Sequence, residues 1–483
     1  MSLIIGANSA SSGGVPLEVT NSVRCDGTSS YFYRTPGSSG SATTATMSAW
    51  VKRCLPGTAT MVFGGQTGTD VNNRTKFGID GTDQLVCQII NGGVVDEWKT
   101  TQLLIDASSW YHLVFVWDTS NATPGDRIKF YINGVRVTDF DTQDAIPLNA
   151  ELKMSTTSDT IYVGARKTTS TINQWFNGYM SEVVFIDGTA LEATDFGMFN
   201  EDTNIWVPIE VENLTFGTNG FYLDMKDSAA LGDDESGNTN DLTVSGLVAL
   251  DQCTDVPTNN FATFNVLHKP SNSVPQWFNG NTYMTVTSGG DWMTALGTFG
   301  AKAGKWYWEY RWTQGTGPRM MGAMSENGLV PDSTGISFYL GNSGQYQGVC
   351  QSTTSGGRRY PGSGGASALG GSSVAIGDVG AIALDLDNQA IYAAKNNTWM
   401  YSGVPTSGAS RTGVLYNIVV DGELWFPGLG IYEGTAPDDC YINFGQPSIA
   451  FGTNADANSY GRFAYTPPTG YYAWCTKNLK DYG

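Results

Sequence analysis

The chain has 483 residues, a net charge of -19 and a sequence pI near 4.4. Such an acidic chain is not a general binder of nucleic acid or of anionic membranes, because both require a basic face. Its 60 glycines, 18 prolines and 12% aromatic residues, with only 15% charged residues, are typical of an all-β protein with many turns.

Residues 1–20 form a small, polar N-terminal arm with one short apolar run and no basic stretch. This pattern is not that of a signal peptide, and no apolar run in the chain is long enough for a membrane helix. We therefore expect synthesis in a cytoplasm and no membrane insertion. Residues 2–14 are our candidate for docking onto a partner, since such arms are often ordered only by contact.

Residues 21–196 are predicted to be a series of short strands separated by turns. Apolar and polar residues alternate, β-branched and aromatic residues are frequent, and the Asn133-Gly134 pair favours a tight hairpin turn. A short helix is expected at 191–199. The predicted strands and hairpins are Met47–Arg53, Lys76–Ile89, Ser108–Asp118, Asp126–Phe140 and Trp175–Gly188.

The order of these segments resembles the laminin-G-like branch of the concanavalin A-like lectin/glucanase superfamily. The segments that carry the resemblance are LEVTNSVRCDGTSSYFYR, SAWVKR, WYHLVFVWD, IKFYINGVRV and WFNGYMSEVVFIDGTAL. The resemblance implies a jelly roll of two antiparallel sheets.

Residues 197–267 are expected to be a β-rich connector. They contain the segments DTNIWVPIEV, GFYLDMKD, GDDESGNTND and DVPTNNFATFN. A jelly roll followed by these segments in this order resembles virion proteins of marine tailed bacteriophages. The resemblance implies a structural protein of a phage particle.

Residues 268–475 are predicted to form a second all-β unit, followed by a C-terminal tail at 476–483. The segments GKWYWE, GDVGAIALDLD, KNN, WFP and INFG resemble those of SPRY domains. This family binds peptides or proteins through loops at one end of a sandwich, which would here be 319–333 and 352–373. The expected fold class is thus all-β, with two antiparallel β-sandwiches joined by the connector.

Catalysis is not expected. The chain has only two histidines, His112 in a strand and His268 beside no serine or cysteine nucleophile. A retaining glycosidase needs two carboxylates on one strand face, whereas Glu182 and Asp187 fall on opposite faces of their strand. Polysaccharide depolymerase activity therefore stays an alternative of lower rank.

The seven cysteines include no CxxC pair, so we expect buried thiols and neither a zinc site nor a disulfide framework. Calcium is a possible cofactor, since the jelly-roll resemblance implies loop sites. The candidate ligands are Asp70 with Asn72, and Asp233 with Asp234, although solvated turn-forming clusters explain the same pattern.

Three tryptophans stand beside turn signals, where exposure is more frequent than in strand centres. Exposed aromatic faces stack on sugars, so Trp98, Trp175 and Trp292 are the candidate ligand-binding residues.

The resemblances together imply a virion-surface structural and adhesion protein, such as a tail fibre or spike, that binds host-surface glycan or protein. Its partners would be other virion proteins, and trimers are implied by analogy with phage fibres. A capsid head fibre or decoration protein with little ligand binding, and an extracellular lectin unrelated to phage, are the remaining alternatives.

Overall fold

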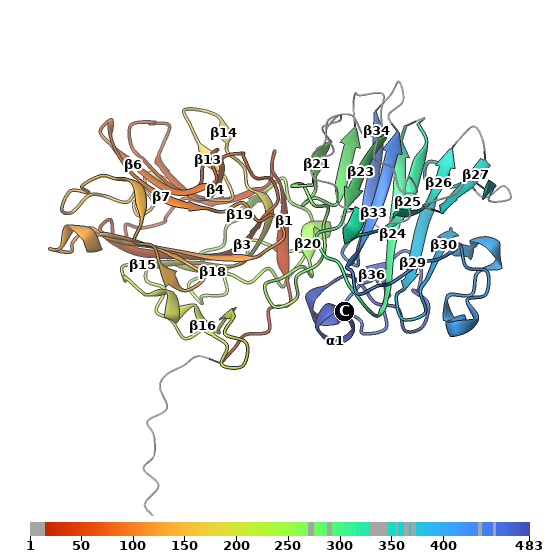
Figure 1. Ribbon diagram of the computed structural model, residues 1–483. Coiled ribbons are helices and arrows are strands. Elements are labelled where there is room, and N and C mark those ends of the chain that lie inside the picture. The colour runs from red at the N-terminus through yellow and green to blue at the C-terminus, as the bar shows by residue number, and fades with distance from the viewer. Residues whose placement is uncertain are drawn as a thin grey trace, which may run out of the picture.

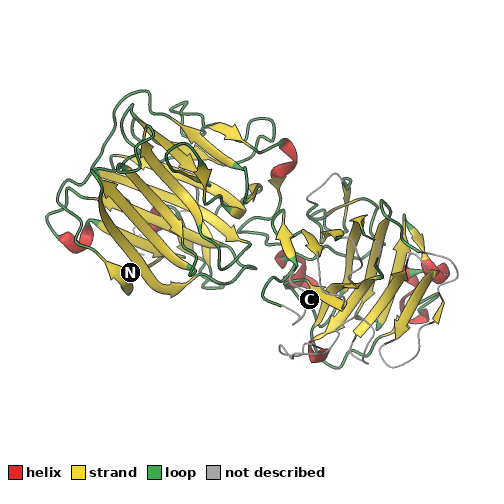
Figure 2. Cartoon of the chain, turned by 90° about the horizontal axis from the view of Figure 1, so that it is seen from above, coloured by secondary structure: helices red, strands yellow, loops and turns green. Residues whose placement is uncertain are grey.

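The computed structural model describes residues 15–268, 275–286, 292–315, 317–328, 346–352, 356–361, 367–368, 373–432, 437–447 and 451–483. Two antiparallel β-sandwiches lie side by side and meet at one junction (Figures 1 and 2). The predicted all-β class is confirmed. Within the described ranges, the only α-helix is α1 (Thr476–Tyr482). The candidate docking arm at 2–14 lies outside these ranges.

The first sandwich consists of two eight-stranded sheets, which we call sheet A and sheet B. Sheet A has the order β10-β9-β8-β3-β15-β1-β20, with β18 also paired to β15. Its strands are β1 (Ser22–Asp26), β3 (Thr44–Arg53), β8 (Tyr111–Asp118), β9 (Ile128–Ile132), β10 (Val135–Arg136), β15 (Asn177–Asp187), β18 (Phe221–Leu223) and β20 (Gln252–Cys253).

Sheet B has the order β11-β7-β6-β5-β4-β12-β2-β19. Its strands are β2 (Tyr31–Arg34), β4 (Thr60–Thr67), β5 (Arg74–Ile79), β6 (Gln84–Asn91), β7 (Val94–Leu103), β11 (Phe140–Gln143), β12 (Asp159–Val163) and β19 (Thr243–Ser245). Side chains alternate along these strands, as a half-buried sheet requires. In β5, Phe77 packs in the core between the sheets, while Lys76 points away from it.

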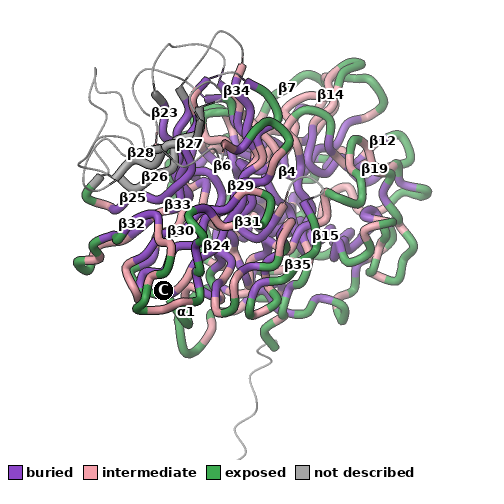
Figure 3. Tube along the Cα trace, turned by 90° about the vertical axis from the view of Figure 1, so that its right-hand side faces the viewer, coloured by how far each residue is buried: buried purple, intermediate pink, exposed green. Residues whose placement is uncertain are grey.

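Residues 197–267, the predicted connector, pack closely on the first sandwich. They supply β18 and β20 to sheet A and β19 to sheet B. They also supply Trp206, Phe216 and Tyr222 to an apolar layer that covers the outer face of sheet A. Hairpin β16 (Gly197–Phe199) and β17 (Trp206–Pro208) belongs to this layer. Both faces of sheet A are thus buried. Figure 3 colours the chain by burial, seen from the side of the second sandwich.

The second sandwich consists of sheets C and D around a core rich in tryptophan. Sheet C contains β21 (Gln276–Phe278), β22 (Tyr283–Val286), β34 (Asp438–Asn443), β24 (Lys305–Gln314), β29 (Val379–Asp385), β30 (Ala390–Lys395), β31 (Thr398–Trp399) and β32 (Tyr416–Asn417). Sheet D contains β23 (Trp292–Leu296), β33 (Trp425–Tyr432), β25 (Arg319–Ser325), β26 (Tyr346–Ser352), β27 (Gly356–Pro361) and β28 (Ser367–Ala368).

A buried polar network joins the two sandwiches. The Lys52 ammonium on β3 donates to the Asp255 carboxylate at 2.7 Å, to Asn260 Oδ1 at 2.7 Å and to the Phe261 carbonyl at 2.8 Å. Both side chains of the ion pair are 0% exposed. Because three acceptors match its three N–H groups, the Lys52 charge is fully satisfied away from water. This network fixes the start of the second sandwich against sheet A.

Two sequence expectations differ from the structure. Residues 191–199 form a single 3-10 turn at Ala193–Asp195 and then strand β16, because Phe199 packs edge-on against Trp206 across the hairpin. The predicted hairpin at 126–140 keeps its turn at Asn133-Gly134, but its second strand is only Val135–Arg136. The chain then crosses to sheet B, where β11 pairs with β7.

Candidate functional site

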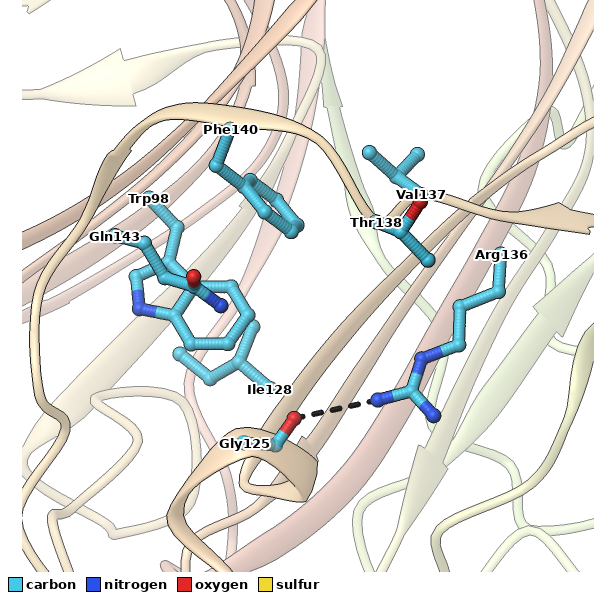
Figure 4. A pocket seen from close by; sticks show the side chains of 8 residues that line it. All are labelled: Trp98, Gly125, Ile128, Arg136, Val137, Thr138, Phe140 and Gln143. Carbon is cyan, nitrogen blue, oxygen red and sulfur yellow. Dashed lines mark hydrogen bonds between the residues drawn. The ribbon is translucent and has the colours of Figure 1, made fainter.

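The crossing from β10 to β11 creates a pocket at the open edge of the first sandwich, which we call the edge pocket (Figure 4). It lies at the sandwich edge formed by β10 and β11, whereas β20, at the other end of sheet A, lies beside the second sandwich (Figure 1). Its volume is about 220 Å³, below the range of drug-sized sites and suited to one small group. It is lined by Trp98, Gly125, Ile128, Arg136, Val137, Thr138, Phe140 and Gln143.

Aromatic rings form the wall of the edge pocket nearest the core. Phe140 meets Trp98 edge-on, with ring centroids 5.1 Å apart, and Trp98 also meets Phe130 edge-on. The Trp98 indole N–H donates to the Asp144 carbonyl at 2.7 Å, so its ring is held in place. Phe140 is partly exposed and faces the pocket (Figure 4). An apolar wall of this kind accepts the C–H face of a sugar ring.

Polar groups stand at the mouth of the same pocket. Arg136 donates to the Gly125 carbonyl at 3.2 Å and pairs with Asp126 at 2.9 Å (Figure 4). Both partners of this ion pair are exposed, at 42% and 38%, so water competes with it and the guanidinium is able to turn toward a ligand. The Gln143 amide and Thr138 hydroxyl are exposed beside it and offer donors and acceptors for hydroxyl groups.

A second, larger hollow, which we call the loop hollow, lies at the turn between β6 and β7. Its volume is about 530 Å³. Burial and the neighbouring Asp144 carboxylate raise the pKa of Asp96, which lines it. Asn91 Oδ1 has no hydrogen-bond partner among the described residues. The other lining residues are Asn73, Gly92, Val94, Pro147, Leu148, Asn149, Ala150, Glu151 and Lys153.

The two hollows flank one structural unit, the strand β7 and the segment that follows β11. Asp144 connects them, because its carbonyl holds Trp98 and its carboxylate accepts the Glu97 backbone N–H at 2.8 Å. Amides, carboxylates and one guanidinium surround apolar walls in this region. This is the chemistry that reads sugar hydroxyls and the apolar faces of sugar rings.

The candidate tryptophans do not gather at one site. The expected exposure of Trp98 is wrong: it is 3% exposed, because its strand faces the core and Phe140 covers its edge. Trp175 is partly exposed and precedes β15, and its carbonyl accepts the Thr60 hydroxyl at the start of β4. The Trp292 side chain lies outside the described residues, although its backbone begins β23. Ligand binding by these residues stays a prediction.

Two of the candidate calcium ligands, Asp70 and Asp234, accept hydrogen bonds from protein donors. Both oxygens of Asp234 accept protein donors, the backbone N–H groups of Tyr222, Ser236 and Asn240 among them. Asp233 and Asn72 are exposed. Asp70 accepts the backbone N–H of Asn72 at 2.9 Å, which lowers the pKa of its carboxyl group. No cluster of three or more acidic, histidine or cysteine residues in the described ranges has metal-holding geometry.

The carboxylates considered for glycosidase chemistry hold the fold together. Glu182 is buried under the connector, where it accepts the Tyr222 hydroxyl, and burial raises its pKa to about 7. Asp187 accepts backbone N–H groups of Ser41 and Asn219. Glu182 Oε2 and both oxygens of Asp187 thus accept structural hydrogen bonds.

The sequence prediction missed Phe140, Arg136 and Gln143. Arg136 and Phe140 belong to the predicted hairpin at 126–140 and Gln143 lies just beyond it, so no prediction placed them beside β7. One signal was available in the sequence: apolar and polar residues stop alternating strictly after Arg136, which indicates that the strand ends there. In the structure, three residues separate β10 from β11.

Comparisons with known proteins agree with this fold. Residues 26–195 match the protein family described as the concanavalin A-like lectin/glucanases superfamily. The first sandwich therefore has a concanavalin A-like fold. No curated protein sequence matches the chain. No helix in the described ranges has the length and apolar character to cross a membrane.

Solved structures resemble parts of the chain. The SPRY domain of human HERC1 is 18% identical, covering 37% of this chain and 96% of its own, with a TM-score of 0.28. The PSpry domain of TRIM65 is 13% identical, covering 38% and 89%, with a TM-score of 0.29. A heptameric pentraxin from Limulus polyphemus is 14% identical, covering 37% and 81%, with a TM-score of 0.28.

Proposed function

We propose that this chain is a non-enzymatic adhesion protein of a bacteriophage virion that binds host-surface glycan through the first sandwich. The edge pocket carries the proposal, because it combines an aromatic wall with exposed polar groups on a concanavalin A-like scaffold. The phage origin rests on the order of the jelly roll and the connector segments in the sequence. The other virion proteins are the expected partners, with trimers supplying avidity to weak sites.

The buried polar network at the junction supports a display role. The edge pocket lies away from the junction, and the buried Lys52 network holds the second sandwich against the first. A glycan site at this edge of the first sandwich, away from the second sandwich, stays accessible to a host surface (Figure 1).

The test is binding of the purified chain to intact bacterial cells and to their extracted surface polysaccharide, using wild type, Phe140→Ala and Gln143→Ala. We expect saturable binding that drops about tenfold in both variants, since each removes one direct contact. Phe199→Ala is the matched control, because Phe199 is an exposed aromatic residue on hairpin β16–β17. Equal binding by the wild type and the three variants would show that the edge pocket does not bind the glycan.

The same samples separate the rival functions. Release of reducing sugar from the polysaccharide would replace the adhesin with a depolymerase. Absence of binding to every strain of a broad panel would favour a passive head fibre or decoration protein.

A further inference from the structure

Three basic side chains lie close together on the outer face of sheet B. We call these residues, Arg74, Lys76 and Arg166, the cation cluster. Arg74 and Lys76 alternate on β5 and both point away from the core. Arg166, in β13 (Arg166–Lys167), reaches them from a crossing segment. Gly64 on β4 pairs with Lys76, and a Cβ at Gly64 would lie 3.7 Å from the Arg166 Cα. The chain crosses the sheet at this glycine because any side chain there would meet the Ala165 carbonyl at 2.9 Å.

No acidic side chain in the described ranges forms an ion pair with the cation cluster. Lys76 and the Arg74 guanidinium also have no hydrogen-bond acceptor there, and the Arg74 Nε is buried. Arg166 donates to Asn173 Oδ1 at 3.3 Å. Lys99 on β7, two strands away from β5, by contrast pairs with Asp80 at 2.6 Å. Three unpaired cations are unexpected in a chain whose net charge is -19.

The surroundings disfavour the charge of these groups. Burial lowers the pKa of Lys76, and the positive charge of Arg166 lowers it further. Burial also lowers the pKa of Arg166 to about 10, with a smaller contribution from the charge of Arg74. The facing carboxylate is Glu97, which accepts the Gln88 amide at 3.0 Å. Partly buried cations that repel one another are stabilised when an anion enters between them.

The cation cluster is next to the loop hollow along β5 and β6. Arg74 follows Asn73, which lines that hollow, and Arg74 pairs in register with Ile90, next to the lining residue Asn91. On the other side of the Arg166 crossing, Tyr31, Tyr33 and Tyr162 form a cluster with ring centroids 5.8–6.4 Å apart on the same outer face. Tyrosine rings on one side and the polar lining of the loop hollow on the other therefore lie near the cations, and both are group types that contact sugars.

We propose that the cation cluster binds the carboxylate or sulfate group of an acidic glycan, with Arg74, Lys76 and Arg166 as the contacting residues. The choice of a glycan rests on the proposed function, whereas the preference for an anion rests on the cluster itself. Guanidinium groups form paired, charge-assisted hydrogen bonds with both kinds of anion. The overall negative charge repels polyanions at long range, so any binding must come from a local site.

The test measures binding of the full chain to three polymers: polygalacturonate for carboxylate, dextran sulfate for sulfate, and neutral dextran. The cluster variant is Arg74→Gln with Lys76→Gln. The control is Lys99→Gln with Lys129→Gln, which removes the same charge from two lysines that already have acidic partners. Thermal unfolding establishes that both variants are folded.

We expect wild type and the control to bind at least one acidic polymer, the cluster variant to bind it about tenfold more weakly or not at all, and added salt to weaken binding. Which acidic polymer binds identifies the anion. Binding of neither acidic polymer, or equal binding by the two variants, would overturn the proposal. Phe140→Ala, measured with cells and with the acidic polymer, separates the two sites. Loss of cell binding with unchanged acidic-polymer binding would leave both proposals standing. Unchanged binding of both would remove the edge pocket alone, and loss of acidic-polymer binding would count against the cation cluster.

Discussion

Trp206 donates its indole N–H to Nδ1 of His112 at 3.0 Å, in the layer that covers sheet A. An indole N–H only donates, so Nδ1 is the acceptor and the Nε2–H of the ring donates to Ser48 Oγ at 2.8 Å. His112 is fully buried, and burial lowers its pKa from 6.5 to about 3. The ring therefore holds β17 on the sheet as a neutral group.

This relationship predicts an acid-sensitive first sandwich. Between pH 6.5 and about 3 the unfolded chain binds a proton at His112 that the folded chain does not, so stability falls as the pH falls. In His112→Gln this dependence disappears. The difference in unfolding free energy between wild type and the variant should shrink by about 2 kcal/mol from about pH 7 to about pH 5. Urea unfolding at each pH measures it; a constant difference would show that His112 does not hold a depressed pKa.

The buried ion pair at the junction should matter far more than a surface pair of equal length. Lys52→Met leaves the Asp255 carboxylate buried without its cation and should cost about 3–5 kcal/mol of stability. Lys129→Met breaks an ion pair with Glu192, also 2.7 Å long but with Glu192 51% exposed, and should cost at most about 1 kcal/mol. Denaturant unfolding of both variants measures the difference. Similar losses would mean that the Lys52 network does not hold the sandwiches together.

Two glycines with nearly the same backbone angle separate steric contact from backbone strain. Gly134 has φ 78° and a Cβ there would lie 2.3 Å from the Trp206 ring, whereas Gly57 has φ 79° and open space around it. Both alanine variants pay the cost of a positive φ, about 1 kcal/mol, and Gly134→Ala should lose about 1–3 kcal/mol more through overpacking. Thermal unfolding compares them. Equal losses would contradict the close packing of Trp206 on the hairpin turn.

The described cysteines should react only after unfolding. Cys25, Cys54, Cys87, Cys253, Cys440 and Cys475 are buried and free. Burial raises the pKa of Cys54 to about 12 and that of Cys253 to about 11, so little thiolate exists near neutral pH. A thiol reagent at about pH 8 should modify these six sites far more slowly in the native protein than in denaturant, as peptide mapping would reveal. Rapid native labelling of any of them would contradict the burial.

Local sequence patterns predicted the strands well because alternation and turn chemistry are local properties. Asn133 and Gly134, with φ of 47° and 78°, adopt the tight turn that their types favour. The crossing of the chain after Arg136 could not be predicted, because it depends on Phe140 packing against Trp98 on a strand far away in the sequence. The Lys52–Asp255 pair joins residues 203 positions apart, and no local pattern marks such a contact. The candidate site depends on contacts of this second kind, which is why turn signals alone did not locate it.

The most direct test of the central claim is the binding of the wild-type chain and of Gln143→Ala to extracted bacterial surface polysaccharide, measured by titration calorimetry. Gln143 is exposed at the mouth of the edge pocket, so its replacement leaves the core unchanged. The account predicts saturable binding by wild type and about tenfold weaker binding by the variant. Identical affinities, or no binding by the wild-type chain to any polysaccharide of a broad panel, would contradict it.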